Sequence, residues 1–198
     1  MFCARIAASI TITLALTAGA AHSQQMPPAP PPIVGPSAPS PLQLGDAFGA
    51  EVTLTEHTII YLKGHTNWDV AFETLIDAFK SLKEYLDKQG ITPNGPAMTI
   101  YTETSDTGFS FEAAMPIAAA PPNPPKGDIA VGQAPSGKAL KFVHRGSYDA
   151  MDSTYEAITN YLDDRGLEAK DLFIEEYTTD PVTTSPDNLV VNVFVPIK

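Results

Sequence analysis

The chain has 198 residues, a formal net charge of −11 and one cysteine. Binding to a phosphate backbone draws on counterion release by basic surfaces, and this acidic chain has neither a basic patch nor a helix-turn-helix signature. We therefore expect no nucleic-acid binding. A single cysteine also excludes an internal disulfide, so the fold has to be stabilised by a hydrophobic core.

The first 23 residues have the organisation of a secretory signal peptide. Arg5 precedes an uncharged, mostly apolar run from Ile6 to Ala21, and the small-x-small sequence Ala21-His22-Ser23 follows. A bilayer-spanning helix needs about 20 strongly apolar residues, and this run is shorter and rich in Thr and Ala. We expect cleavage near Ser23 and a periplasmic or secreted mature chain without stable membrane insertion. A retained N-terminal anchor is the alternative.

Proline-rich segments divide the rest of the chain. Residues 24–47 are mostly Pro, Ala and Ser, a composition that favours an extended, semi-rigid tether over a packed core. Residues 48–198 have the length of one ordinary domain. A second proline-rich stretch, Ala118–Gly127, separates this domain into half-repeats of about 48–120 and 127–198.

The two half-repeats have the same order of elements. In each, an apolar strand leads through a glycine into a helix that starts with an aromatic residue, Trp68 in the first half and Tyr148, 80 positions later, in the second. Asn67 and Ser147 are the expected N-caps. Each helix carries an apolar stripe and stops at a glycine.

Two strands that can form a hairpin follow each helix, and an extra strand is predicted to begin each half, at 51–55 and 128–132. A duplicated strand-helix-strand-strand unit favours an α+β fold, in which one curved antiparallel sheet carries both helices on one face.

Three features of the second half resemble a known family. The segment 144–149 (His-Arg-Gly-Ser-Tyr-Asp) is similar to a Gly-x-Tyr helix start, and 175–181 (Glu-Glu-Tyr-Thr-Thr-Asp-Pro) is similar to a Glu-x-Tyr-x-x-Asp-Pro motif. The last strand also ends in proline, at Pro196. Over residues 48–198 the chain resembles the gyrase-inhibitor-like (GyrI-like) family, whose fold is also the effector-binding domain of bacterial multidrug-sensing transcription activators.

This resemblance implies a cleft between two pseudo-symmetric halves, where aromatic side chains and a carboxylate hold lipophilic, often cationic, small molecules. It also implies a possible activity, because some members hydrolyse strained small molecules. The family's last strand often carries Glu where this chain has Asn192, whereas the first half keeps Glu112 at the matching position.

Strand alternation predicts which side chains line the cleft. If Leu172 and Ile174 face the helices, their neighbours face away from the helices, and Glu176 belongs to the helix side. The same reasoning in the first half takes Met98 and Ile100 as facing the helices. The cleft is therefore expected on the sheet face opposite the helices. The predicted ligand-binding residues are Glu175, Tyr177, Tyr101, Glu112, Phe173, Asn192, Trp68 and Tyr148.

Aromatic faces and a partly desolvated carboxylate together attract an organic cation. Burial disfavours the charge of a Glu, so such a Glu can bind a cation or, beside Tyr, transfer a proton. The structural alternative is that these Tyr and Glu side chains only pack or stay solvated, with Trp68 and Tyr148 in the core.

No metal or cofactor is expected. His57, His65 and His144 lie on separate elements without a metal-ligand spacing, and no motif marks a haem ligand, a Gly-x-Ser-x-Gly elbow or a phosphate-binding loop. The function we expect is a non-enzymatic, periplasmic binder of a lipophilic, cationic small molecule. Two alternatives stay open: a hydrolase using Glu175 and Tyr177 as acid-base partners, and an envelope interaction protein whose vestigial cleft is packed shut by Phe173 and Phe194.

Overall fold

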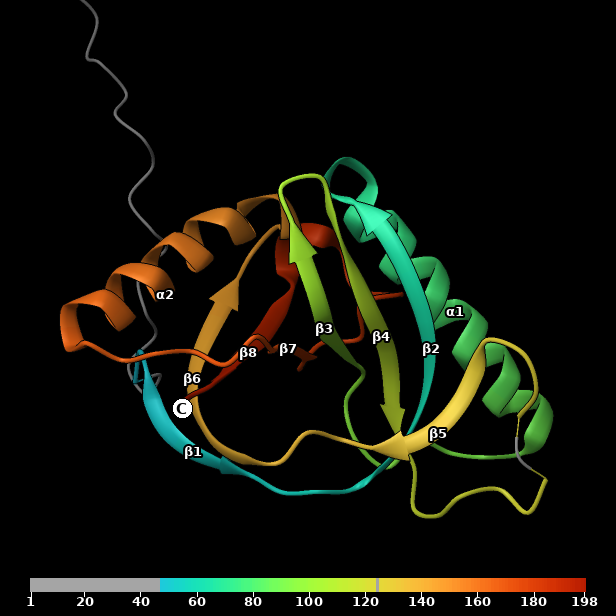
Figure 1. The fold of residues 1–198 in the computed structure, drawn as a ribbon. Helices are drawn as coiled ribbons and strands as arrows, with labels where there is room; N and C mark the ends of the chain where they lie inside the picture. The colour runs from blue at the N-terminus through green and yellow to red at the C-terminus, as the bar shows by residue number, and fades with distance from the viewer. Residues whose placement is uncertain (1–46, 124) are drawn as a thin grey trace, which may run out of the picture. The chain divides into compact units, whose positions relative to one another are not determined.

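The computed structural model describes residues 47–123 and 125–198 (Figure 1). The predicted signal peptide and nearly all of the predicted tether lie outside the described residues. Among the described residues no helix is long and apolar enough to cross a membrane. The strands are β1 (Ala50–Leu54), β2 (Thr58–Asn67), β3 (Met98–Ser105), β4 (Gly108–Pro116), β5 (Ile129–Gln133), β6 (Gly137–Arg145), β7 (Phe173–Tyr177) and β8 (Val190–Pro196). The helices are α1 (Ala71–Gln89) and α2 (Met151–Arg165), preceded by the 3-10 turns η1 (Trp68–Val70) and η2 (Tyr148–Ala150).

The two α-helices end at the predicted glycines, but the predicted starts at Trp68 and Tyr148 are 3-10 turns, and the α-helices begin three residues later, at Ala71 and Met151. The Ser147 hydroxyl accepts a hydrogen bond from the Asp149 backbone N–H and so caps η2, whereas Asn67 makes no such side-chain bond. Gly90 and Gly166 end the helices with φ of 66° and 61°, a left-handed conformation that glycine adopts without steric cost. Helix α1 has 19 residues and α2 has 15, a difference of about one turn.

The sheet confirms the predicted duplication. Its described strands are all antiparallel and run in the order β1-β6-β8-β7-β3-β4-β2-β5. The order reads symmetrically outward from the central β7–β3 pair. Strand β1 pairs with β6 of the second half, and β5 pairs with β2 of the first half. The first strand of each half-repeat is thus exchanged with the other half, so the halves fold as one domain.

Both helices cover the same face of the sheet, as predicted. Their apolar stripes form one buried cluster with alternate residues of the strands, including Phe109 and Phe111 of β4, Phe142 of β6 and Val193 of β8. The opposite face carries a smaller apolar cluster, which contains Met98, Ile100, Ile174, Ile59 and Ala114. The sheet therefore has apolar side chains on both faces.

The predicted orientation of β3 and β7 is wrong. Ile100 and Ile174 pack on the face away from the helices, while Tyr101 and Tyr177 belong to the cluster under the helices. Glu176 also lies on the far face, where it accepts a hydrogen bond from the amide of Asn192 at 2.8 Å. Alternation alone distinguishes the two faces of a strand only when one face is polar, and here both faces are apolar.

Candidate functional site

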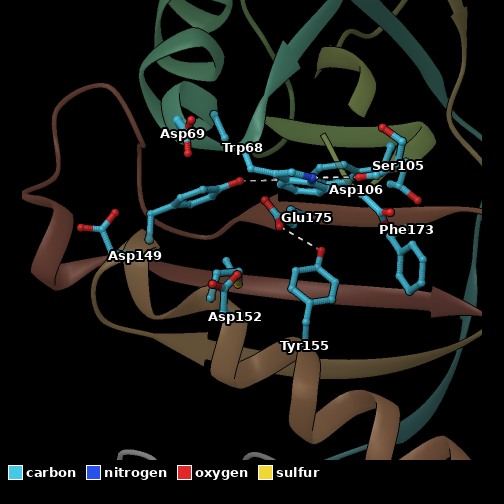
Figure 2. A pocket seen from close by; sticks show the side chains of 14 residues that line it. Trp68, Asp69, Ser105, Asp106, Asp149, Asp152, Tyr155, Phe173 and Glu175 are labelled. Carbon is cyan, nitrogen blue, oxygen red and sulfur yellow. Dashed lines mark hydrogen bonds between the residues drawn. The ribbon is translucent and has the colours of Figure 1, made fainter. Parts of the chain in front are cut away.

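A cavity of about 830 Å³ opens on the helix-covered face, between the starts of the two helices (Figure 2). Strands β3 and β7 lie beneath it. The expected position of the cleft, on the face opposite the helices, is therefore wrong. The lining residues are Trp68, Asp69, Ala71, Tyr101, Thr104, Ser105, Asp106, Tyr148, Asp149, Met151, Asp152, Tyr155, Phe173 and Glu175.

Glu175 lines the cavity from the central strand β7, and its side chain is fully buried. The Tyr155 hydroxyl on α2 donates a hydrogen bond to Oε1 at 2.9 Å, and the Tyr177 hydroxyl on β7 donates to Oε2 at 2.9 Å. The Thr99 hydroxyl on β3 lies 3.4 Å from the Tyr177 oxygen and extends this network into the first half. Both carboxylate oxygens are therefore held by tyrosines, and the carboxylate has a fixed orientation.

Burial raises the pKa of Glu175 because the charged form loses its hydration, and the hydrogen bonds from Tyr177 and Tyr155 partly oppose this rise. The pKa values of Tyr101, Tyr148, Tyr155 and Tyr177 are all raised well above 10.0, first by burial and then by the negative charge of Glu175. The tyrosines thus stay protonated and serve as donors around a single acid.

Aromatic side chains from both halves form the walls. The hydroxyls of Tyr101 and Tyr148 are 3.0 Å apart, and the Tyr148 ring stacks on Phe72 with centroids 4.8 Å apart. Phe173 meets the ring of Tyr155 edge-on at 5.9 Å. Trp68 is 46% exposed, and its indole N–H donates to the backbone oxygen of Ser105 in the β3–β4 hairpin at 2.9 Å.

The site does not follow the pseudo-symmetry of the fold. Ala114 of β4 corresponds to Phe194 of β8, 80 positions later. Met98 pairs with Ala114 and Ile174 pairs with Phe194, so Met98 corresponds to Ile174. The next residue on each strand also corresponds, which makes Thr99 the counterpart of Glu175. The two counterparts face each other across the central strand pair, but only the second half supplies a carboxylate.

The structure brings most of the predicted site residues together. Glu175, Tyr101, Phe173, Trp68 and Tyr148 line the cavity, and Tyr177 contacts Glu175.

The two remaining predicted residues lie elsewhere. Glu112 forms an ion pair with Lys63 at 3.6 Å, away from the cavity. Asn192 bonds Glu176 and lines a separate cavity of about 590 Å³ near the end of α1. Both residues were assigned to the cleft from the matching positions of the last hairpin strands. Those positions belong to the face that the helices leave uncovered.

Tyr155 is the residue bonded to Glu175 that the sequence prediction missed, and the lining residues Asp69, Asp106, Asp149 and Asp152 were not predicted either. Tyr155 lies on the apolar stripe of α2, where the periodicity predicts a packing residue, and it does pack against the core cluster under the helices. Its phenol is the one polar group that this stripe directs at Glu175, as Figure 2 shows. A tyrosine on an otherwise apolar helix face, next to a strand with a buried Glu, is the signal that could have identified it.

The histidines of the described region form no metal site. Within residues 47–123 and 125–198, no group of three or more His, Cys, Asp or Glu is arranged to hold a metal ion. His144 has a structural role. Its Nδ1 lies 2.8 Å from the Thr154 hydroxyl, and its Nε2 lies 3.0 Å from the Ser147 backbone oxygen, so it joins β6 to the start of α2.

A cavity with one buried acid, tyrosine donors and aromatic walls defines a small-molecule binding domain. The sequence model of the GyrI-like small molecule binding domain matches residues 50–198, so the chain belongs to the GyrI-like family. This finding confirms the family and the fold class expected from the sequence. No curated protein matches the chain.

Solved structures share the fold at low sequence identity. EcmrR in its DNA complex aligns with a TM-score of 0.66 at 16% identity, over 76% of this chain and 57% of EcmrR. The chain thus spans little more than half the length of that protein. The isolated EcmrR C-terminal domain aligns with a TM-score of 0.60 at 15% identity, over 76% of this chain and 96% of the domain.

Two further structures carry names that describe a ligand or an activity. SAV2435 bound to tetraphenylphosphonium aligns with a TM-score of 0.53 at 15% identity, over 77% of this chain and 94% of that one. A hydrolase from Listeria innocua aligns with a TM-score of 0.52 at 12% identity, over 82% of this chain and 94% of that one. At these identities the likeness establishes the fold alone.

Proposed function

We propose that this protein is an exported, periplasmic receptor or scavenger that binds a lipophilic organic cation in the cavity between its helices. The observation that carries the proposal is the fully buried Glu175 in an aromatic cavity that, among the residues the structure describes, no Lys or Arg lines. A buried carboxylate without a basic partner is stabilised by any cation that enters, because the cation restores the charge interactions lost with water.

The walls suit the apolar part of such a ligand. Trp68, Tyr148 and Tyr101 supply aromatic faces, which attract cations by about 0.5–2 kcal/mol per contact when water is excluded. A volume of about 830 Å³ lies within the range of pockets that hold drug-sized molecules. The tetraphenylphosphonium bound by SAV2435 is a ligand of this class and a suitable first probe.

The predicted signal peptide supports the proposed location. Export would separate the domain from DNA and from gyrase, so the ligand would be bound for capture or sensing in the envelope. The open cavity supports a binding role over a vestigial cleft, since Phe173 lines the cavity without closing it and Phe194 packs on the other face.

Calorimetric titration of the mature protein with tetraphenylphosphonium tests the proposal. We expect measurable binding and a raised thermal midpoint. Glu175→Gln should weaken the affinity about 2- to 30-fold, the equivalent of one cation contact. The matched control Glu112→Gln removes the same charge outside the cavity and should leave the affinity unchanged. Absence of heat and of thermal stabilisation over a panel of lipophilic cations would refute the proposal.

A hydrolase is the second candidate, and one observation favours it. Glu175 accepts hydrogen bonds from two tyrosines, an arrangement in which a carboxyl with a raised pKa can exchange a proton with a substrate. The name of the Listeria innocua protein points in the same direction. Multiple turnovers of a strained or activated substrate, abolished by Glu175→Gln, would replace the binding role with this one.

A further inference from the structure

Four aspartates surround the opening of the cavity. Asp69 in η1, Asp106 in the β3–β4 turn, Asp149 in η2 and Asp152 in the first turn of α2 all line the cavity that contains Glu175. Figure 2 shows their side chains around that carboxylate. We call these four residues the mouth aspartates. They come from both half-repeats and are exposed, whereas Glu175 is buried.

The mouth aspartates are not neutralised by neighbouring side chains. Within the described residues none of the four forms an ion pair, and no Lys, Arg or His lines the cavity. On α1, by contrast, Asp77 pairs with Lys80 and Asp87 pairs with Lys83. A cavity lined by one sign of charge, with low-dielectric aromatic walls, concentrates the electrostatic potential at its opening.

A cation with one positive charge would pair with only one of these two groups of carboxylates. Its charge can neutralise Glu175 at the buried end, which leaves the mouth aspartates facing the apolar end of the ligand. A ligand with a second positive charge at its outer end would meet them directly. The aromatic side chains that line the same cavity, among them Tyr148 and Trp68, would contact the apolar spacer that joins the charges.

We propose that the cavity selects dications, elongated molecules with two positive charges joined by an apolar spacer, with one charge at Glu175 and the other at the mouth aspartates. The inference rests on the proposed cation-binding function and adds the number of charges that the ligand carries. The cavity lies within a small-molecule binding domain, and these carboxylates line it.

A structural role explains part of the same pattern. Asp149 and Asp152 occupy the first turns of η2 and α2, where a carboxylate stabilises the positive end of a helix. Asp106 lies in a hairpin turn, outside any helix. The two roles differ in their consequences, because only the ligand-binding role makes affinity depend on the number of charges in the ligand.

The test compares decamethonium with decyltrimethylammonium by calorimetry at low salt. The two share a ten-carbon chain and one quaternary ammonium, and only decamethonium has a second. We expect decamethonium to bind about tenfold more tightly, as one further partly desolvated charge contact provides. The preference should shrink in 0.5 M NaCl, because salt screens exposed carboxylates more than buried ones.

Two double variants separate a local effect from net charge. Asp149→Asn with Asp152→Asn should reduce the preference for decamethonium to about twofold or less, because it weakens decamethonium binding more than decyltrimethylammonium binding. Asp163→Asn with Asp164→Asn removes the same charge at the other end of α2 and should keep the full preference. If the first double variant fails to fold, Asp106→Asn provides the same comparison outside the helix.

The outcomes distinguish this inference from the proposed function. Binding of decyltrimethylammonium without a preference for decamethonium would overturn the inference and keep the proposed function. The inference would also be overturned if the Asp149→Asn, Asp152→Asn double variant kept the full preference for decamethonium. Equal loss of the preference in both double variants would overturn it too. Failure of every cation to bind would overturn both.

Discussion

Removing one hydroxyl from the Glu175 network should make stability depend on pH in a defined way. In Tyr155→Phe the ring keeps its edge-on contact with Phe173, but the donor 2.9 Å from Oε1 is lost. The ionised carboxylate then retains the bond from Tyr177 and loses the bond from α2. We expect the pKa of Glu175 in the folded state, already raised by burial, to rise further.

The sign of the effect follows from linkage. The pKa of Glu175 is raised in the fold from its ordinary value of 4.5, so between 4.5 and the folded value the native state keeps a proton that the unfolded state has lost. This contribution to stability is present below pH 4.5 and disappears as the pH rises through the folded pKa. A further rise in that pKa extends the loss to higher pH.

The magnitude follows from the hydrogen bond that is removed. At pH 4 Glu175 is protonated, and Tyr155→Phe removes a neutral hydrogen bond worth about 0.5–1.5 kcal/mol. Above the folded pKa of Glu175 the same bond goes to a buried carboxylate and is worth about 1.5–3 kcal/mol. We therefore expect Tyr155→Phe to destabilise the protein by about 1 kcal/mol more at pH 8 than at pH 4.

Urea unfolding at both pH values, followed by fluorescence, measures this difference. Tyr161→Phe is the matched control, because Tyr161 lies on the same helix and donates to the neutral backbone oxygen of Gly49 at 3.1 Å. Its cost should be the same at both pH values. If Tyr155→Phe also costs the same free energy at pH 4 and pH 8, the assignment of Glu175 as the charged acceptor is refuted.

Three further predictions concern the rest of the fold. Burial lowers the pKa of His144 from 6.5, so stability should fall as the pH drops from about 6.5 towards the folded value, and His144→Gln should flatten that part of the urea-midpoint profile. Gly49 has φ of 77°, and a Cβ there would overlap the ring of Tyr161, whereas Gly90 has φ of 66° and open space around the same position. Gly49→Ala should therefore lower the free energy of unfolding, measured by chemical denaturation, by about 1 kcal/mol more than Gly90→Ala. Glu112→Gln breaks a partly exposed ion pair and should change the free energy of unfolding by less than about 1 kcal/mol, so a larger loss would contradict its placement.

The site was predictable where local sequence carried the chemistry. Glu175, Tyr101 and Phe173 were assigned correctly to one surface, because residues two apart on a strand share a face, whichever face it is. The direction of that face was not predictable. Ile100 and Ile174 are apolar on the far side, where they form a second cluster, so neither side of the central strands is marked as exterior.

The sequence by itself determined the elements of this protein and their duplication. Helix stripes, glycine stops and strand runs are local signals, and they specify strand, helix, strand, strand twice over. Only the tertiary structure decided which half each outer strand joins, since β1 pairs with β6 and β5 with β2. It also placed the Tyr155 hydroxyl of α2 within hydrogen-bond distance of Glu175 on β7. Strand partners and cavity contacts join segments that are far apart in the chain. The free energy gained when these segments are buried together cannot be read from a local sequence pattern.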